Sequence, residues 1–318
     1  MNMPNTTLDV ITVGEAMVLF AAQQAGPLDD ASSFARTTAG AELNVAIGLA
    51  RLGLRVGYLT RLGQDLFGRH IAATLASEGI DADHVVTDAE HPTGFMLKSR
   101  SDDGSDPQIQ YFRKGSAASH MQVGELSRAY CTSARHLHLT GIFVGVTPST
   151  REVVFELAAR SRAAGLSVSF DPNLRPTLWR SKDEMVEGLN RLSTFCDWVL
   201  PGLEEGRLLT GRDSAQGIAD FYLERGAKGV VVKLGPGGAF YATPTEHGHV
   251  AGVPVARVVD TVGAGDGFAV GVISGLLEGL PLAAAVARGN TIGARVVQFP
   301  GDADGLPTRA ELDAPVKG

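Results

Sequence analysis

The chain has 318 residues, which is enough for one large α/β domain or for a large domain with a small appendage. Hydrophobic residues make up 44% and charged residues 20%, a composition that excludes a disordered chain and a coiled coil. The formal net charge is −7, with Lys and Arg scattered along the chain. Nucleic-acid binding is therefore disfavoured, because it needs a concentrated basic footprint.

The sequence shows no pattern typical of secretion or of membrane insertion. The opening residues, MNMPNTTLDV, lack the positive charge and the apolar run of a signal peptide, and no stretch approaches about 20 apolar residues. The two cysteines, Cys131 and Cys196, lie far apart, so we expect two buried thiols rather than a disulfide. These features predict a cytoplasmic protein without membrane contact.

Strands and helices alternate in the first part of the chain. Leu8–Val13 is predicted as a buried strand, and Glu42–Leu52 as a helix with apolar residues at i, i+4 and i+7. Val56–Leu59 is predicted as the next strand, followed by a helix over Gly68–Glu78.

The middle of the chain breaks this alternation. Thr93–Ser99 and Ile109–Arg113 are predicted as two strands joined by the polar turn Arg100–Asp106, with no helix between them. We expect this hairpin to join strands near the N-terminus in a small sheet over the main body. The lid strands are placed within about residues 15–40 and 93–115.

Alternation then resumes and continues almost to the end. Strands and a hairpin are predicted at His136–Thr140, Leu166–Phe170, Trp198–Leu200, Gly229–Leu234 and Gly238–Val255, and helices at Thr150–Ala164, Gly265–Leu277 and Leu282–Val297. Strands that alternate with helices indicate a mostly parallel sheet covered on both faces. Ligands of such sheets bind at the carboxyl ends of the strands, which is where the motifs below fall.

The most informative motif is DTVGAGD, which ends in Gly263, Ala264, Gly265 and Asp266 at the start of a predicted helix. Free N–H groups and the positive end of the helix dipole favour an anion there, and small residues let a phosphoryl group approach the backbone. The adjacent carboxylate can accept the proton of an attacking hydroxyl. The residues alone leave an alternative, in which Asp266 only caps the helix.

Two motifs together resemble a known family. DTVGAGD resembles the C-terminal signature of the ribokinase-like carbohydrate kinases, and GAELNVA at Gly40–Ala46, followed by Leu52 and Gly53, resembles their N-terminal signature. The resemblance implies one domain over residues 1–318, with a three-layer αβα core, a mostly parallel sheet and a small β-sheet lid. It also implies ATP and Mg²⁺ as cofactors, Asp266 as the catalytic base and 263–266 as the anion hole.

The nucleotide side is predicted around KLGPGG, which follows the strand Gly229–Leu234. A hairpin loop is the alternative for this turn. Asn290 is a candidate for the adenine end or an ordinary polar residue on a helix face. The resemblance assigns ATP contacts to Asn173, Lys233, Gly235, Pro236, Gly237, Gly238, Gly263, Gly265 and Asn290.

Magnesium positioning is harder to predict. Members of the family often carry an N-x-x-E motif, and here Glu205 matches the acid, whereas Gly202 stands in place of the Asn. Glu205 is therefore predicted to act on the metal indirectly, with a first-turn helix acid as the alternative.

The acceptor side has candidates from several segments of the chain. They are Gly40, Asn44, Tyr111, Arg113, Arg175, Asp266 and Asp302. Two arginines in one pocket suit a carboxylate, which a guanidinium binds bidentately, although surface ion pairs are the alternative for each.

The strings GEAM, YFRKGSA, DPNLR and LPGLEE resemble the 2-keto-3-deoxygluconate kinase branch of the family. That branch phosphorylates the terminal hydroxyl of a six-carbon keto-acid sugar, which implies the same activity here. One departure is Met96, where some members have a Tyr that can donate a hydrogen bond. The alternatives are a kinase for a neutral sugar such as fructose or ribose, and an inactive sugar- or nucleotide-binding regulator.

We also expect a homo-oligomer that pairs through the lid sheet.

Overall fold

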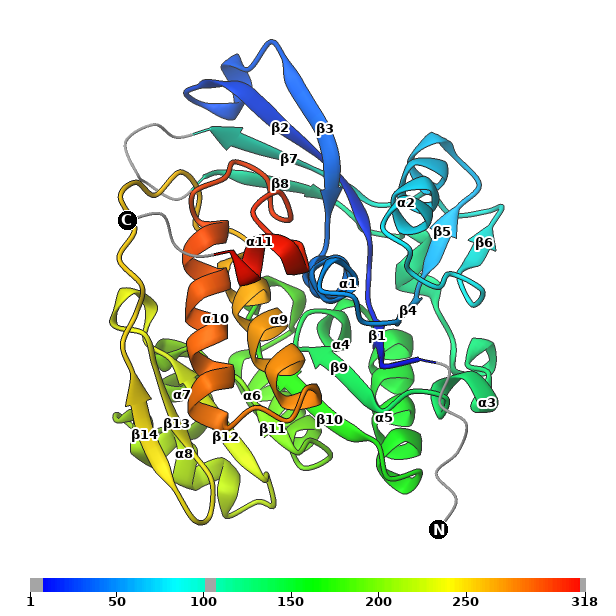
Figure 1. Cartoon of the computed structure of the whole chain (residues 1–318). Helices are drawn as coiled ribbons and strands as arrows, with labels where there is room; N and C mark the ends of the chain where they lie inside the picture. Colours follow the sequence, from blue (N-terminus) through cyan, green and yellow to red (C-terminus); the bar gives the residue numbers. More distant parts are fainter. Residues whose placement is uncertain (1–7, 101–106, 315–318) are drawn as a thin grey trace.

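The structure is a computed structural model that describes residues 8–100 and 107–314. At its centre lies one eight-stranded sheet (Figure 1). Its strands follow the order β14 (His247–Val250), β13 (Ala239–Ala242), β12 (Gly229–Lys233), β11 (Trp198–Val199), β10 (Ser167–Asp171), β9 (His136–Thr140), β1 (Val10–Val13) and β4 (Val56–Leu59). The strands from β12 to β4 run parallel, and β13 and β14 extend the sheet as antiparallel strands.

Helices cover both faces of the sheet. One face carries α3 (Arg128–Cys131), α4 (Phe143–Val146), α5 (Pro148–Ala163), α6 (Lys182–Ser193), α7 (Leu203–Thr210) and α8 (Ala215–Leu223). The other face carries α1 (Ala41–Arg51), α2 (Leu66–Ser77), α9 (Ala264–Leu277), α10 (Leu282–Val296) and α11 (Arg309–Asp313).

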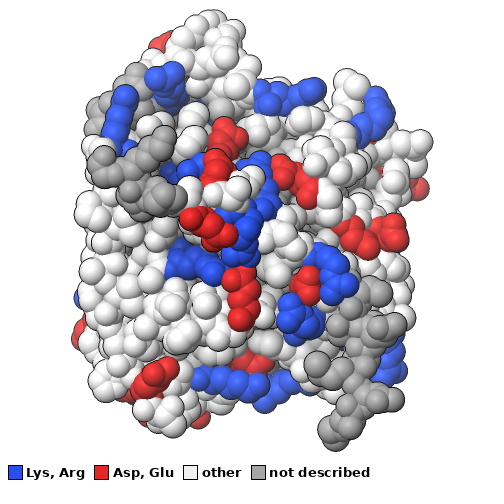
Figure 2. Space-filling model, viewed as in Figure 1, with Lys and Arg blue, Asp and Glu red and all other residues white. Residues whose placement is uncertain are grey.

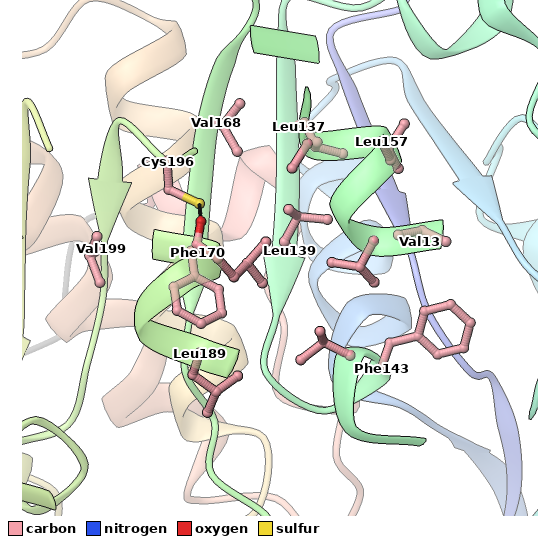
Figure 3. Packing of buried hydrophobic residues seen from close by; sticks show 14 of the residues in the cluster. Val13, Leu137, Leu139, Phe143, Leu157, Val168, Phe170, Leu189, Cys196 and Val199 are labelled. Carbon is pink, nitrogen blue, oxygen red and sulfur yellow. Dashed lines mark hydrogen bonds between the residues drawn. The ribbon is translucent and has the colours of Figure 1, made fainter. Parts of the chain in front are cut away.

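Alternation along the strands explains these layers. Val230 and Val232 of β12 belong to the first hydrophobic cluster, whereas Val231 belongs to the second. Figure 3 shows part of the first cluster, in which Phe170 of β10 and Leu189 of α6 pack together. Because both faces of the strands are apolar, the sheet needs a helical layer on each side, and the predicted three-layer core is confirmed.

A second, four-stranded sheet lies over one end of the main sheet (Figure 1). We call it the lid sheet; its strands follow the order β3 (Phe34–Ala39), β2 (Met17–Ala25), β7 (Phe95–Arg100) and β8 (Ile109–Phe112). The predicted hairpin is the antiparallel pair β7–β8, and the residues predicted as its turn, 101–106, lie outside the described residues. The central pair, β2 and β7, is parallel.

Most predicted elements agree with the structure to within one or two residues at each end, as β4 and β9 do. The elements not predicted from the sequence include α3, α4, α6, α8 and α11, and also the small ribbon formed by β5 (Arg61–Gly63) and β6 (Val86–Asp88), whereas α7 was anticipated only by the alternative that Glu205 is a first-turn helix acid. Helix α6 carried a readable signal, since the buried residues Met185, Leu189 and Leu192 follow the i, i+4, i+7 spacing.

The surface is mixed in charge on the side that carries α10 and α11, where Figure 2 shows acidic and basic side chains interleaved. Arg295 pairs with Glu311 at 2.6 Å, and Arg309 pairs with Glu278, so ion pairs hold α11 to its neighbours. Both cysteines are buried free thiols, as predicted. Among the described residues, none of the helices has the length and apolar character needed to cross a membrane.

Candidate active site

The carboxyl ends of the parallel strands meet beneath the lid sheet and line a cavity of about 450 Å³. The cavity is lined by residues that follow β1, β9 and β10 and by the last residue of β12. The N-terminal ends of α1 and α9 and residues of the lid sheet complete the lining. The predicted site residues that line this cavity are Gly40, Asn44, Tyr111, Arg113, Asn173, Arg175, Glu205, Lys233, Gly263, Gly265, Asp266 and Asp302. Segments from most of the chain thus converge on one place.

Asp266 lies in the first turn of α9 with its side chain almost fully buried. Its Oδ2 atom accepts a hydrogen bond of 2.8 Å from Nδ2 of Asn44 in α1, and Gly263 rather than Asp266 occupies the N-cap. Burial raises the pKa of Asp266 to about 8, although the Asn44 hydrogen bond acts in the opposite direction. A carboxyl group whose pKa lies close to neutral pH suits a general base.

Gly263 allows the turn that precedes Asp266. Its φ of 83° is left-handed, and a Cβ atom there would collide with the carbonyl oxygen of Asp302. The next residues, Ala264 and Gly265, begin α9, so the N–H groups of its first turn point toward the cavity end of the helix. This geometry suits an anion such as a phosphoryl group.

Lys233 ends β12 at the cavity, where its Nζ atom lies 2.6 Å from Oδ2 of Asp171, which ends β10. Burial by itself would lower the pKa of Lys233, but Asp171 and Glu205 raise it, so the ammonium stays charged. The same Nζ atom would lie 3.6 Å from a Cβ atom on Gly265. A cation therefore stands beside the N-terminus of α9.

Arg113 is already engaged by a carboxylate. Its guanidinium contacts Oε2 of Glu15 through Nε at 2.7 Å and Nη2 at 2.5 Å, and Ser116 donates to the other oxygen of Glu15. Tyr111 lines the same part of the cavity, with the Arg113 guanidinium 5.9 Å from its ring centre. Glu15 thus neutralises the Arg113 guanidinium, which was predicted from the sequence to bind a carboxylate of the substrate.

Arg175 has a different environment. It is partly exposed at the cavity, and Nη1 donates to the carbonyl oxygen of Leu174 at 2.9 Å. The preceding Asn173 has a left-handed φ of 37°, stabilised by a hydrogen bond from its N–H to Asp171. This turn directs the 173–175 segment to the cavity.

Some predicted nucleotide residues lie outside the cavity lining. Gly235–Gly237 form a short 3₁₀ turn after β12, and Gly238 (φ 94°) packs against the segment that follows β14. Asn290 of α10 holds the same segment, because its Nδ2 atom donates to the carbonyl oxygens of Val250 and Ala251. These residues form one unit beside the cavity, and their contact with ATP remains a prediction.

Glu205 reaches the cavity from α7. Its two carboxylate oxygens accept hydrogen bonds from the N–H groups of Gly202 at 2.7 Å and Leu174 at 2.8 Å. Glu205 therefore caps its own helix and supports the Arg175 loop. Both interpretations of this residue made from the sequence remain open.

Three charged residues near the site were not predicted from the sequence. Glu15 follows β1, Glu42 lies in α1, and Lys98 lies in β7, all almost fully buried. Glu42 accepts a hydrogen bond from Thr140, and burial raises its pKa to about 7. The position of Glu15 just after a buried strand was a readable signal, since ligands bind at strand ends.

Comparison with known proteins places the chain among carbohydrate kinases. The model of the pfkB family carbohydrate kinases matches residues 7–309, so the chain belongs to that family, and the predicted kinase class is confirmed. It is thus a carbohydrate kinase that uses ATP.

Individual relatives agree with this. The chain is 49% identical over 306 residues to a 2-dehydro-3-deoxygluconokinase of Bacillus subtilis, covering 96% of this chain and 94% of the relative. A PfkB protein from Polaromonas sp. JS666 superposes with a TM-score of 0.90 at 55% identity, covering 97% of this chain and 100% of that one. An E. coli protein provisionally called ribokinase II, solved with ATP and Mg²⁺, superposes with a TM-score of 0.88 at 26% identity, covering 96% and 98%.

Proposed function

We propose that this chain transfers the γ-phosphoryl group of ATP to the terminal hydroxyl of 2-keto-3-deoxygluconate, which is another name for 2-dehydro-3-deoxygluconate. The observation that carries the proposal is the meeting of Asp266, the N-terminus of α9 and Arg175 in one cavity. The Bacillus subtilis relative supports the choice of substrate by its name.

In this proposal each part of the cavity has a role. The N–H groups of the first turn of α9, with Lys233 beside them, suit the charge on the transferred phosphoryl group. Asp266 accepts the proton of the sugar hydroxyl as that oxygen attacks phosphorus, and Asn44 orients its carboxylate. The lid sheet covers the cavity and limits the access of water, which would otherwise compete as acceptor.

Mg²⁺ fits the oxygen ligands that the cavity offers. Glu205 and Asp171 both present carboxylates there. The oxygens of Glu205 each accept one backbone hydrogen bond and keep a second lone pair, which suits a contact through a metal-bound water. When bound, the ion neutralises charge on the phosphate oxygens.

Selection of a sugar acid depends mainly on Arg175. Its guanidinium lines the cavity and matches a carboxylate in shape and charge. Arg113 contributes less net charge, because Glu15 is bound to it. That ion pair is the one observation that favours the second candidate function, phosphorylation of a neutral ketohexose or pentose.

A kinetic panel distinguishes the two functions. With ATP in excess, kcat/KM should be at least about 10²-fold higher for 2-keto-3-deoxygluconate than for fructose or ribose, because the carboxylate of the sugar acid pairs with Arg175 and a neutral sugar has no group that does so. A coupled assay for ADP release measures both. Faster turnover of a neutral sugar would overturn the sugar-acid assignment and leave the kinase assignment intact.

The pH profile tests the partnership between Asn44 and Asp266. The base works when deprotonated, so kcat/KM should fall as the pH drops below about 8. Asn44→Ala removes a donor that stabilises the carboxylate, worth about 1.5–3 kcal/mol, so kcat/KM at pH 7 should fall about tenfold or more, and the deficit should shrink above pH 9. A deficit that stays equal at every pH would show that Asn44 only binds substrate.

We also infer pairing of two copies through the lid sheet, and a cytoplasmic location where ATP is available. The edge strand β8 exposes Tyr111 by 40% and Phe112 by 45%. An apolar strand edge of this kind suits a second copy of the chain. Light scattering at assay concentration should give a dimeric or larger mass; a monomeric mass would refute the pairing.

A further inference from the structure

Strand β7 of the lid sheet carries a lysine that faces the core rather than the solvent. Lys98 is 2% exposed, and it lies on the same face of β7 as Met96, which lines the cavity. A charged side chain is almost never fully buried unless it is paired. The partners of Lys98 therefore indicate what this residue does.

The Lys98 ammonium bridges two carboxylates from the segments that precede α9 and follow α10 in the sequence. Its Nζ atom lies 2.6 Å from Oδ2 of Asp260, the first residue of the DTVGAGD motif, and 2.6 Å from Oδ1 of Asp302, in the segment after α10. Both aspartates are buried. Three segments that are distant in the sequence meet at one nitrogen atom.

Both aspartates also hold the backbone of the glycine motif. Oδ1 of Asp260 accepts a hydrogen bond of 3.0 Å from the N–H of Val262, and the backbone of Asp302 packs directly on Gly263. Gly263 is the N-cap of α9, three residues before Asp266. The ammonium is thus connected, through two carboxylates, to the turn at the N-terminus of α9.

Among the described contacts of Asp260 and Asp302, Lys98 is the one cation that bridges the two carboxylates, and its removal would leave them without a bridge. Two buried, ionised carboxylates that share one site repel each other, so the segments that carry them would separate or one carboxyl group would take up a proton. Burial alone would lower the pKa of Lys98, but Asp302 and Asp260 raise it, so the bridge stays charged.

A second cavity gives access to the bridge. It measures about 160 Å³, and Lys98, Asp260, Val259, Pro300 and Ala21 are among the residues that line it. Asp302, the other partner, lines the catalytic cavity. The bridge therefore stands between the two cavities, and a small primary ammonium ion from solvent could reach the position of Nζ if the lysine side chain were shortened.

We propose that Lys98 is a positioning residue for phosphoryl transfer, which couples the seating of the lid sheet to the geometry of the glycine turn at the N-terminus of α9. The proposal rests on the proposed transfer of a phosphoryl group at that helix end. Lys98 is not proposed to touch the substrate or ATP; it acts through Asp260 and Asp302. A displacement of reacting groups by about 1 Å typically costs about 10²-fold in rate.

Lys98→Ala tests the proposal, with kcat measured per folded molecule well below the melting temperature. The assay uses whichever sugar the parent enzyme phosphorylates best, so an error in the assigned sugar acid does not affect the result. We expect kcat to fall about 10²-fold with smaller changes in KM for ATP. n-Propylammonium chloride, which replaces the deleted part of the side chain, should restore at least tenfold of kcat, whereas equal sodium chloride or tetramethylammonium chloride should not.

A double variant covers the case in which Lys98→Ala does not fold. Lys98→Met with Asp260→Asn keeps the net charge of the cluster and the acceptor for Val262, so it should fold and still lose kcat about 10²-fold. Lys228→Met is the matched control, since that lysine also pairs with an aspartate, Asp197, but is 71% exposed and far from the site. Unchanged kcat in the folded double variant, or a loss in Lys98→Ala that propylammonium leaves unaltered, would overturn the proposal.

Discussion

The Asp266→Asn variant is expected to lose about 10²–10⁴-fold in kcat, the usual contribution of a positioned general base, while ATP binding changes little. Asparagine keeps the size of the side chain, and its amide oxygen can still accept the hydrogen bond from Asn44. What it removes is the ability to take the proton of the attacking hydroxyl. Steady-state kinetics and a titration with ATP measure the two quantities separately.

Asp220→Asn is the control for this experiment. Asp220 is an exposed aspartate of α8 that accepts a hydrogen bond from Gln216 on the same helix, so the substitution should leave kcat unchanged. If Asp266→Asn retained turnover within tenfold of the parent, Asp266 would not be the base. The N-terminus of α9 would then act by binding phosphate alone.

The second large effect is expected for Arg175→Ala, which should raise KM for 2-keto-3-deoxygluconate about 30-fold or more and change kcat less. Truncation of one partner of a buried charge pair typically costs 2–5 kcal/mol, much of it because the other charge stays unpaired. A neutral acceptor makes no such pair, so its kcat/KM should hardly change. Initial-rate measurements with both acceptors give the comparison.

Two further variants sharpen this test. Arg175→Lys keeps the charge but loses the bidentate fork, so it should recover only part of the affinity. Arg180→Ala lies a few residues along the same segment and is exposed, so it should behave like the parent. An equal loss of kcat/KM for acid and neutral sugars in Arg175→Ala would mean that the arginine supports the loop, for instance through its contact with Leu174, rather than the substrate carboxylate.

The parts of the site that could be predicted from the sequence are those formed by residues close together in the chain. DTVGAGD places Gly263 and Asp266 on one turn of a helix, and the start of the helix Ala41–Arg51 places Asn44 within its first turns, so local geometry was sufficient. The layered core was equally predictable, because strands such as Gly229–Lys233 are apolar on both faces.

The contacts that the sequence could not predict depend on pairing across the lid. Glu15, just before β2, meets Arg113, just after β8, and Lys98 of β7 meets Asp302 from the segment after α10, so both contacts depend on how the lid strands pair and seat. Register of this kind depends on packing between segments distant in the sequence. Composition alone also gave no means to tell an arginine reserved for substrate from one already paired with a carboxylate.

The most direct test of the account is a crystal structure of the enzyme with 2-keto-3-deoxygluconate and a non-hydrolysable ATP analogue. We expect a carboxylate oxygen of Asp266 within about 2.6–3.2 Å of the terminal hydroxyl, the γ-phosphate at the N–H groups of 264–266, and the substrate carboxylate on Arg175. A sugar bound with its terminal hydroxyl away from Asp266, or with its carboxylate away from Arg175, would contradict the account.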